Sequence, residues 1–268
     1  VPNVSVPNKK MADWALIGND KAYRVQSQWD YSRDTDIYLV NVKNGERNLI
    51  KEKACFGGMS VSPNGEWVVL YDKLAKAWFQ YTIATGELKD LTSALGVAFH
   101  DEDHDTPSLP GSYGQAVWFK DNSAFLINDR FDYWMFDPKG VAEPKMFTES
   151  YGRNNNTRLT LEAVIADPED DSPMAGFGAM EIRAGEPLYF STYNFKTKET
   201  GFVMKDAKKK KSSMGKLVEG PYTYRNLAYS KPAKGKKAAY VFARGNFEDG
   251  NNAYITYDNF KTQKQITD

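Results

Sequence analysis

Residues 59–73, "MSVSPNGEWVVLYDK", and residues 116–130, "AVWFKDNSAFLINDR", share one pattern. Each stretch has a short strand-forming run, a polar turn, and a longer apolar run that closes on Asp-Lys or Asp-Arg. The turns are Pro-Asn-Gly at residues 63–65 and Lys-Asp-Asn at residues 120–122. Asn, Asp and Gly tolerate the positive φ that a tight hairpin turn requires. The pattern therefore predicts two β-hairpins of the same design.

Fainter copies of this hairpin occur twice more in the chain. Residues 14–30, "WALIGNDKAYRVQSQWD", offer a turn at Gly18-Asn19-Asp20, and residues 227–245, "LAYSKPAKGKKAAYVFARG", offer a longer one. Apolar runs on either side of such turn residues are typical of hairpins. We expect both segments to fold as the first two do.

A second kind of hairpin follows the first each time. In it, a Tyr-, Phe- or Ile-rich strand meets a turn such as Asn44-Gly45 or Thr85-Gly86, and a short strand then closes on Leu-Thr, Phe-Thr or Ile-Thr. Its copies are residues 38–52, 79–93, 134–149 and 254–268. Two hairpins make a four-stranded antiparallel sheet, which cannot bury both of its faces alone and must stack on its neighbours.

These repeats predict an all-β fold, a β-propeller built of four-stranded antiparallel blades. About five blade units are present, in either a whole or an incomplete ring, so that residues 1–268 are a single propeller domain or part of one. The fourth unit would take its strands from residues 157–167, 187–195 and 200–206, with residues 168–186 as a Gly- and Pro-rich insertion. A β-sandwich is less favoured because the turn position and the closing Thr repeat as well. The approximate blades are residues 11–53, 54–95, 112–149, 157–219 and 222–268.

Composition excludes several classes of protein. The 268 residues are 41% hydrophobic and 14% aromatic, enough for a real core, and 35 Lys and Arg balance 35 Asp and Glu. That balance argues against a nucleic-acid partner, which usually shows as a basic excess. No apolar stretch approaches the roughly 20 residues of a membrane helix, so no membrane partner is expected. The single Cys55 cannot form an internal disulfide.

The middle of the chain resembles a known family. Residues 100–140, "HDEDHDTPSLPGSYGQAVWFKDNSAFLINDRFDYWMFDPKG", followed by residues 144–158, "PKMFTESYGRNNNTR", resemble the propeller of bacterial serine peptidases of the prolyl oligopeptidase family, of the dipeptidyl-peptidase-like kind. The resemblance continues through residues 190–202 and 243–268 and covers most of the chain from about Asp30. The matching elements are Tyr113-Gly114, Trp118, Lys120-Asp121, residues 129–134 and residues 154–156.

The sequence departs from the family pattern at two places. Residues 249–252 read Asp-Gly-Asn-Asn where family members usually carry an acid and a proline, and His104 stands at a position that is more often Asn-like. The family's catalytic serine sits in Gly-x-Ser-x-Gly in an α/β-hydrolase domain, with Asp and His following. That motif does not occur in these 268 residues. Residues 111–114, Gly-Ser-Tyr-Gly, do not match it, since the serine directly follows the first glycine. We therefore predict no catalytic residue in this chain.

The resemblance implies a non-catalytic propeller domain of a prolyl-oligopeptidase-like serine peptidase. Such a domain would gate and position peptide substrates for a hydrolase domain outside this chain. The implied partners are a peptide substrate and a C-terminal α/β-hydrolase domain of the same protein, with no cofactor, in either the bacterial periplasm or the cytoplasm. A free-standing propeller that acts as a protein- or carbohydrate-binding scaffold is the alternative. A propeller hydrolase such as a lactonase or glycosidase, with carboxylates or calcium lining its channel, is a third.

One loop holds both histidines of the chain, His100 and His104. Their i, i+4 spacing would suit a metal on a helix, but the zinc-peptidase pattern puts Glu directly after the first His, and prolines follow closely here. The simplest interpretation is a solvated connection between the second and third blades. The other is substrate handling, in which acidic side chains attract the amino terminus or a basic side chain of a peptide. The acidic candidates are Asp101, Glu102, Asp103 and Asp105.

Two further stretches have structural interpretations. Residues 129–136, "DRFDYWMF", carry aromatic residues on both faces of the expected strand, which suits a strand packed between blades better than a recognition patch. Asp129 and Arg130 are expected to form an ion pair at the blade edge. The lysines at residues 208–211 are expected at a solvated hairpin tip.

Overall fold

The computed structural model describes residues 3–5, 14–162, 181–206, 214–230 and 237–267. The chain divides into two compact units, Val1–Lys145 and Met146–Asp268, and each is described by itself. The lysines at 208–211 and residues 168–180 of the expected insertion lie outside the described residues.

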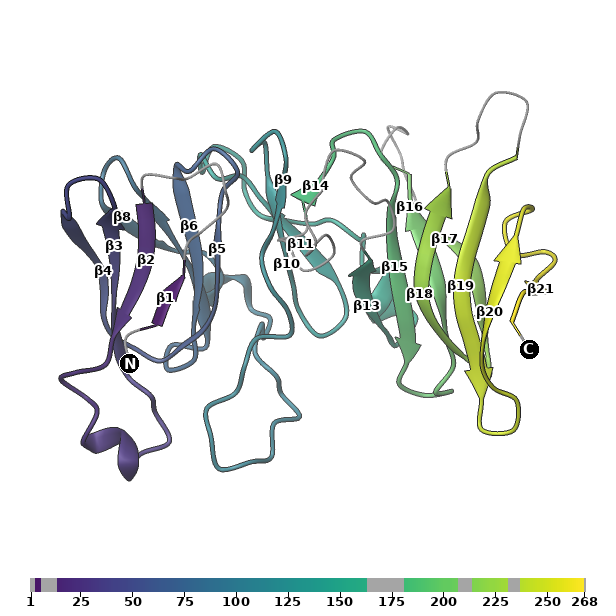
Figure 1. Cartoon of the computed structure of the whole chain (residues 1–268), viewed down its shortest axis with the longest axis horizontal. Helices are drawn as coiled ribbons and strands as arrows, with labels where there is room; N and C mark the ends of the chain where they lie inside the picture. The colour runs from purple at the N-terminus through teal and green to yellow at the C-terminus, as the bar shows by residue number, and fades with distance from the viewer. Residues whose placement is uncertain (1–2, 6–13, 163–180, 207–213, 231–236, 268) are drawn as a thin grey trace. The chain divides into compact units, whose positions relative to one another are not determined.

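The N-terminal unit begins with two four-stranded antiparallel sheets (Figure 1). In each sheet the strand order follows the chain, β1-β2-β3-β4 and then β5-β6-β7-β8. The first sheet comprises β1 (Asn3–Ser5), β2 (Trp14–Asn19), β3 (Thr35–Asn41) and β4 (Arg47–Ala54). The second comprises β5 (Phe56–Val61), β6 (Trp67–Asp72), β7 (Ala77–Thr82) and β8 (Glu87–Asp90).

A third antiparallel sheet continues the unit with shorter strands. Its order is β12-β11-β10-β9, and β12 lies at the boundary of the two units. Two short 3-10 helices, η1 (Gln26–Gln28) and η2 (Ser93–Leu95), lie in connections of this unit. The strands are β9 (Val117–Phe119), β10 (Phe125–Asn128), β11 (Tyr133–Phe136) and β12 (Lys145–Met146).

The C-terminal unit contains two further four-stranded antiparallel sheets, in the orders β13-β15-β16-β17 and β18-β19-β20-β21. A short helix, α1 (Tyr151–Asn154), precedes them, and β14 (Glu181–Ile182) follows β13. The predicted all-β class with repeated four-stranded antiparallel sheets is therefore confirmed. The strands are β13 (Thr157–Glu162), β15 (Leu188–Asn194), β16 (Thr200–Lys205), β17 (Met214–Gly220), β18 (Thr223–Ser230), β19 (Ala239–Asn246), β20 (Gly250–Thr256) and β21 (Lys264–Gln265).

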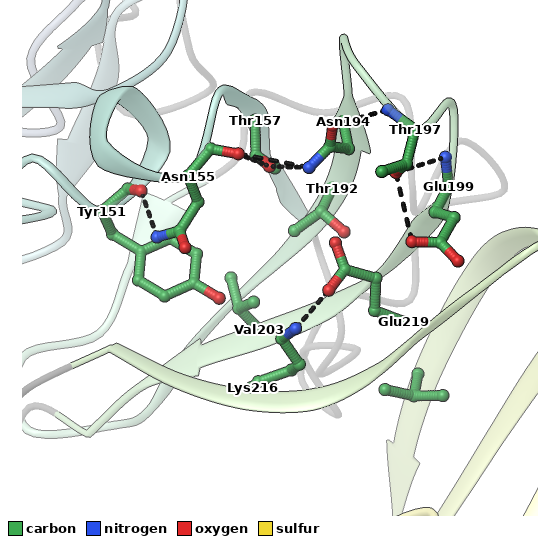
Figure 2. Close-up of a pocket in the computed structure, with 11 residues that line it drawn as sticks. Tyr151, Asn155, Thr157, Thr192, Asn194, Thr197, Glu199, Val203, Lys216 and Glu219 are labelled. Carbon is green, nitrogen blue, oxygen red and sulfur yellow. Dashed lines mark hydrogen bonds and ion pairs between the residues drawn. The ribbon is translucent and has the colours of Figure 1, made fainter.

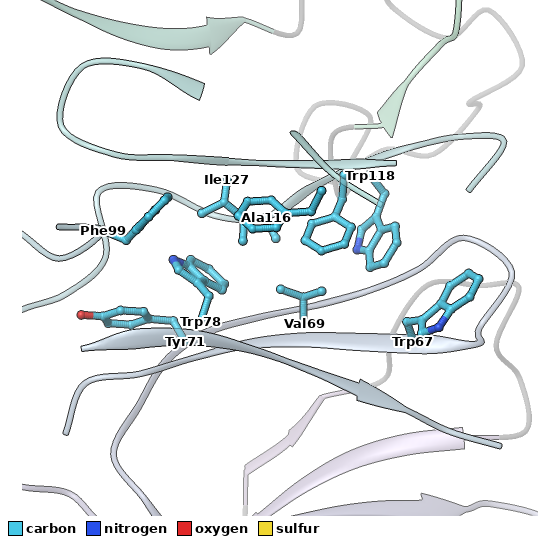
Figure 3. Packing of buried hydrophobic residues seen from close by; sticks show 10 residues of the cluster. Trp67, Val69, Tyr71, Trp78, Phe99, Ala116, Trp118 and Ile127 are labelled. Atoms are coloured by element: carbon cyan, nitrogen blue, oxygen red, sulfur yellow. The ribbon is translucent and has the colours of Figure 1, made fainter. Parts of the chain in front are cut away.

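Strand β6 shows why the sheets stack. All six of its residues are buried. Trp67, Val69 and Tyr71 belong to the core shared with the third sheet, whereas Val68 and Leu70 belong to the core shared with the first sheet. Because alternate residues of a strand face opposite sides, a strand buried on both faces must be apolar throughout. Figure 3 shows the first of these cores, in which the ring centroids of Trp67 and Trp118 lie 6.3 Å apart.

The C-terminal unit has its own aromatic core between its two sheets. Phe202 and Tyr189 of the fourth sheet contact Phe242 and Tyr240 of the fifth, and Phe260 of the connection between β20 and β21 completes this core. The ring centroids of Phe202 and Phe242 lie 6.2 Å apart with the rings nearly perpendicular, a favourable arrangement of aromatic quadrupoles.

The turns predicted from Gly and Asn are confirmed where tight hairpins form. Gly65 and Asn122 adopt φ of 77° and 61° in the two hairpins that open the second and third sheets. Gly45 and Gly86 adopt φ of 75° and 72° in the second hairpin of the first and second sheets. These positive φ values are what type I′-like turns and bulged turns require.

Two local predictions are wrong. Gly18-Asn19-Asp20 is not a hairpin turn, since β2 runs through Asn19 and a connection of residues 20–34 precedes β3. Gly18 serves packing, because a Cβ there would lie 2.9 Å from Thr35 Cγ2. The strand expected over residues 129–136 begins only at Tyr133, and residues 129–132 form a turn.

Candidate functional site

The connections that carry the predicted site residues share one end of the N-terminal unit. Successive strands run antiparallel, so the ends of β2, β6, β8 and β10 and the beginnings of β3, β7, β9 and β11 lie on the same side. Cys55 alone separates β4 from β5, which brings the first two sheets together there. We call this side the loop end. Figure 1 shows residues 20–34 and the loop near residue 105 extending beyond the strands at this end.

The acidic loop, residues 100–112, is closed at its base by backbone pairing. Asp101 N donates to Gly111 O at 2.8 Å, and Tyr113 N donates to Phe99 O at 3.2 Å. His100 and Ser112 form an isolated antiparallel bridge between these bonds. Phe99 is 1% exposed and belongs to the core between the second and third sheets. The base of the loop is thus fixed to the core.

Hydrogen bonds also order the acidic side of the loop. Glu102 N donates to Tyr113 Oη at 2.9 Å, and the same hydroxyl donates to Glu102 Oε2 at 3.2 Å. Asp101 Oδ1 accepts the N–H of Asp103 at 3.1 Å. Burial is the largest cause that raises the pKa of Tyr113, to about 12. The phenol is therefore protonated, and able to donate, throughout the neutral range.

A second element positions the loop from outside. Arg130, in the turn between β10 and β11, donates to Asp103 Oδ2 at 2.8 Å. Asp129 builds this turn: its Oδ1 accepts the N–H groups of Phe131 and Asp132 at 2.7 and 2.8 Å. Its Oδ2 accepts Trp134 Nε1 at 2.9 Å. This ion pair joins the acidic loop to the β10–β11 turn, although an ion pair this exposed adds little to the stability of the fold.

The two histidines occupy different positions in the loop and share no helix. His104 Nε2 lies 3.0 Å from Ser108 O, 2.9 Å from Ser108 Oγ and 3.2 Å from Thr106 Oγ1. One ring nitrogen therefore ties the residues of a single turn together. Within the described residues, no group of three or more His, Cys, Asp and Glu side chains is placed to hold a metal.

The contact between His104 and Ser108 has the elements of a nucleophile and a base. Activation of a serine also needs a third group that orients the histidine and donors for the oxyanion. Here the serine is four residues away on the same exposed turn, and the histidine nitrogen is shared with the Ser108 carbonyl and Thr106. The geometry accounts for a stable turn.

His100 is partly buried. Burial is the largest cause that lowers its pKa below the ordinary value of 6.5, and the Lys76 ammonium lowers it further. Asp101 and Glu102 oppose the shift without reversing it. The imidazole is accordingly neutral at pH 7, and the negative charge of the acidic loop is not offset by this residue.

All four predicted acidic residues lie in this one loop. Glu102, Asp103 and Asp105 are exposed and Asp101 is half-buried. Among these four carboxylates, Asp103 is the one that forms an ion pair with a cation in the described part of the chain. The loop end thus carries an excess of negative charge on a connection whose backbone is held in place.

Sequence reasoning missed a second surface at the loop end. Val25, Trp29 and Tyr31, on the connection of residues 20–34, are 70%, 75% and 66% exposed. This aromatic loop is ordered all the same, because Asp36 Oδ1 accepts Tyr23 Oη at 2.6 Å and Lys53 N at 3.0 Å. One feature of the sequence could have predicted this exposed surface. Residues 26–34 form a polar run without strand or helix periodicity, and a Trp and a Tyr lie inside it.

Searches against family models and against curated proteins both give no match. A putative dipeptidyl aminopeptidase IV from Bacteroides ovatus matches 87% of this chain and 32% of its own, with a TM-score of 0.51 and 9% identity. A GH74 enzyme from Niastella koreensis matches 99% and 31%, with a TM-score of 0.49 and 10% identity. TolB from Acinetobacter baumannii matches 95% and 52%, with a TM-score of 0.42 and 12% identity.

These comparisons bear on the fold. The chain spans about half the length of TolB and about a third of the length of the dipeptidyl aminopeptidase. No helix among the described residues is both long enough and apolar enough to cross a bilayer. Together with the stacked four-stranded sheets, the likeness to the Bacteroides ovatus protein confirms that this chain has a β-propeller fold.

Proposed function

We propose that this chain is the non-catalytic propeller domain of a prolyl-oligopeptidase-like serine peptidase. In this role it gates and positions peptide substrates for a hydrolase domain outside residues 1–268. The five sheets would then be one propeller or part of one. The chain's sequence resemblance to that family supports the proposal, as does the fold shared with a putative dipeptidyl aminopeptidase IV.

The acidic loop carries the proposal. Asp101, Glu102, Asp103 and Asp105 lie on a connection that is closed at its base and held by Arg130 and Tyr113. A carboxylate and an ammonium 4 Å apart attract by about 4 kcal/mol at the dielectric of a protein surface, and less once salt screens them. Because the loop is preorganised, little entropy is lost when a peptide amino terminus binds to it.

The proposal is tested by kinetics of the full-length gene product. Glu102→Gln with Asp105→Asn removes two exposed carboxylates and leaves the Asp103 ion pair and the loop base intact. Exposed charge pairs are worth about 0.2–1 kcal/mol each, so kcat/KM for a dipeptide substrate with a free amino terminus should fall about fivefold. The same peptide with an acetylated amino terminus should show no change.

Glu87→Gln is the matched control. Glu87 is exposed at the beginning of β8, at the opposite end of the second sheet from the acidic loop. It should leave both substrates unaffected. An equal loss for free and acetylated peptides in the Glu102→Gln, Asp105→Asn variant would show that the loop does not read the amino terminus.

A scaffold that binds another protein is the second candidate. The exposed Val25, Trp29 and Tyr31 of the aromatic loop favour it, because ordered surface loops that present large apolar groups mark interaction sites. The natural reading frame separates the candidates. A hydrolase domain with Gly-x-Ser-x-Gly beyond Asp268 supports the peptidase, and its absence supports the scaffold.

A further inference from the structure

A pocket of about 260 Å³ opens on one face of the fourth sheet, within the C-terminal unit. Its lining includes Thr192 from β15, Val203 from β16 and Lys216 from β17. Tyr151 of α1 closes one side, and Figure 2 shows its ring directed toward the same space as Thr192 and Glu219. The pocket and the acidic loop belong to different units of the chain.

A β-bulge shapes the pocket. Phe202 pairs with Val218 and Val203 pairs with Lys216, so Leu217 is an extra residue in β17. A bulge of this kind re-aims side chains and bends the strand. Here it places Lys216 opposite Val203 and lets the Lys216 ammonium form an ion pair with Glu219.

The wall near the β15–β16 turn is locked by one side chain. Asn194 Oδ1 accepts the N–H groups of Lys196 and Thr197 at 2.9 and 3.0 Å. Its Nδ2 donates to Asn155 O at 3.2 Å and to Thr157 Oγ1 at 3.3 Å. These polar groups are occupied, and the cavity they border is therefore preformed.

Two hydroxyls in the pocket are unoccupied. Thr192 is 6% exposed, yet among the described residues its hydroxyl has no hydrogen-bond partner. Tyr151 is likewise without a hydrogen-bond partner for its phenol in the described part of the chain, and burial raises its pKa, which keeps it protonated. Both residues line the pocket, so their hydroxyls are open to water or to a ligand. A hydroxyl can both donate and accept.

The charges of the pocket disfavour an anionic ligand. Lys216 and Glu219 neutralise each other, and the Glu199 carboxylate, whose Oε2 accepts the Thr197 hydroxyl at 3.1 Å, leaves one negative charge in the lining. The carboxylate oxygens left over accept hydrogen bonds, and the two free hydroxyls give and accept them. Val203 adds an apolar surface for C–H groups.

The size of the pocket suits a small ligand. A volume of about 260 Å³ lies below the usual range of sites for drug-sized ligands. We propose that this pocket binds a neutral, hydroxyl-rich ligand of the size of a monosaccharide, with Thr192, Tyr151 and the Glu219 carboxylate as its hydrogen-bonding groups. This site is independent of the proposed peptidase role.

Calorimetric titration of the 268-residue chain tests the site. The probes are D-glucose, D-galactose and D-mannose, with glycine and ethylamine as charged comparisons. At least one sugar should bind saturably with a Kd near 1 mM, which is an ordinary affinity for a small polar ligand. Thr192→Val, which keeps the β-branched shape, should weaken that binding at least about fivefold, and Tyr151→Phe should do the same.

Thr160→Val is the matched control. Thr160 is an exposed residue of β13 in the same sheet and is not part of the pocket lining, so its variant should bind as the unmodified chain does. Thermal unfolding establishes that each variant is folded. Absence of saturable sugar binding, equal binding by the Thr192→Val chain, or tighter binding of glycine or ethylamine would each overturn the proposal.

Discussion

Replacement of Trp118 tests the stacking of the second and third sheets. Trp118 is 3% exposed, and its ring centroid lies 4.6 Å from that of Phe125 and 6.3 Å from that of Trp67. Truncation to Ala removes these contacts and leaves a cavity between the sheets. Large aromatic-to-Ala changes in a core cost about 3–5 kcal/mol of unfolding free energy, and we expect Trp118→Ala to fall in that range.

Trp118→Phe should behave differently because the indole N–H is buried without a hydrogen-bond partner in the described residues. A buried unpaired donor costs about 1–3 kcal/mol, which the phenyl ring does not incur. The smaller ring loses some apolar contact, about 1–2 kcal/mol. The two terms nearly cancel, and the net change should lie within about 1 kcal/mol of zero.

Urea unfolding followed by tryptophan fluorescence measures both values. The chain has six Trp residues, and all of them lie in the N-terminal unit, so the signal reports on that unit. Trp29→Ala is the control, because Trp29 is 75% exposed and surface changes usually stay within about 0.5 kcal/mol. A loss for Trp118→Phe as large as that for Trp118→Ala would refute the reasoning.

Three further predictions concern polar groups of the N-terminal unit. Trp134 Nε1 donates to Asp129 Oδ2 at 2.9 Å, and Asp129→Asn would place an amide N–H₂ opposite that donor. We expect this change to lower the free energy of unfolding in urea by about 2–4 kcal/mol. Adding Trp134→Phe should recover part of the loss, and no recovery would contradict the assigned hydrogen bond. The pKa of His100 is lowered in the folded state, so the unfolded chain binds a proton at this residue more readily. The free energy of unfolding should therefore decline as the pH falls below 6.5. The same decline should be smaller in the pH profile of the His100→Gln variant, measured by urea unfolding. Lys51 Nζ lies 2.8 Å from Asp72 Oδ2, and the Asp72 side chain is 4% exposed, so Lys51→Met leaves a buried carboxylate without its cation. This change should lower the free energy of unfolding by about 3–5 kcal/mol. Lys51→Met with Asp72→Leu should recover most of that loss, and equal stabilities of the single and double variants would contradict the prediction.

Local chemistry explains which parts of the fold could be predicted. The hairpin turns could be predicted because their backbone needs positive φ, which favours residues such as Gly65 and Asn122 at those positions. The apolar run of β6 followed from burial on both faces. In these cases the local sequence and the tertiary environment require the same residues.

The two wrong predictions concern residue types that occur in more than one structural role. Gly18 looks like a turn residue, but it is needed because Thr35 packs closely against it in a neighbouring strand. Asp129 looks like a strand residue by alternation, but its side chain caps two backbone N–H groups in a turn. Asp129 itself is the sequence signal, because an Asp side chain can accept the backbone N–H two residues ahead of it in an Asx turn.

The candidate site was only partly accessible from sequence. The acidic side chains of residues 101–105 could be placed in one loop because they are adjacent in the chain. The contact of Arg130 with Asp103, and the pocket beside Thr192, depend on strand register and on a bulge near Leu217. Register across a sheet joins residues that are distant in sequence, and no local pattern specifies it.

Labelling by a serine-directed fluorophosphonate tests the central claim most directly. The full-length gene product and the 268-residue chain are treated side by side, and the labelled peptide is identified by mass spectrometry. The account predicts that the full-length product is labelled at a serine outside residues 1–268 and that the 268-residue chain stays unlabelled. Stoichiometric labelling within the chain, at Ser108 beside His104 above all, would contradict it.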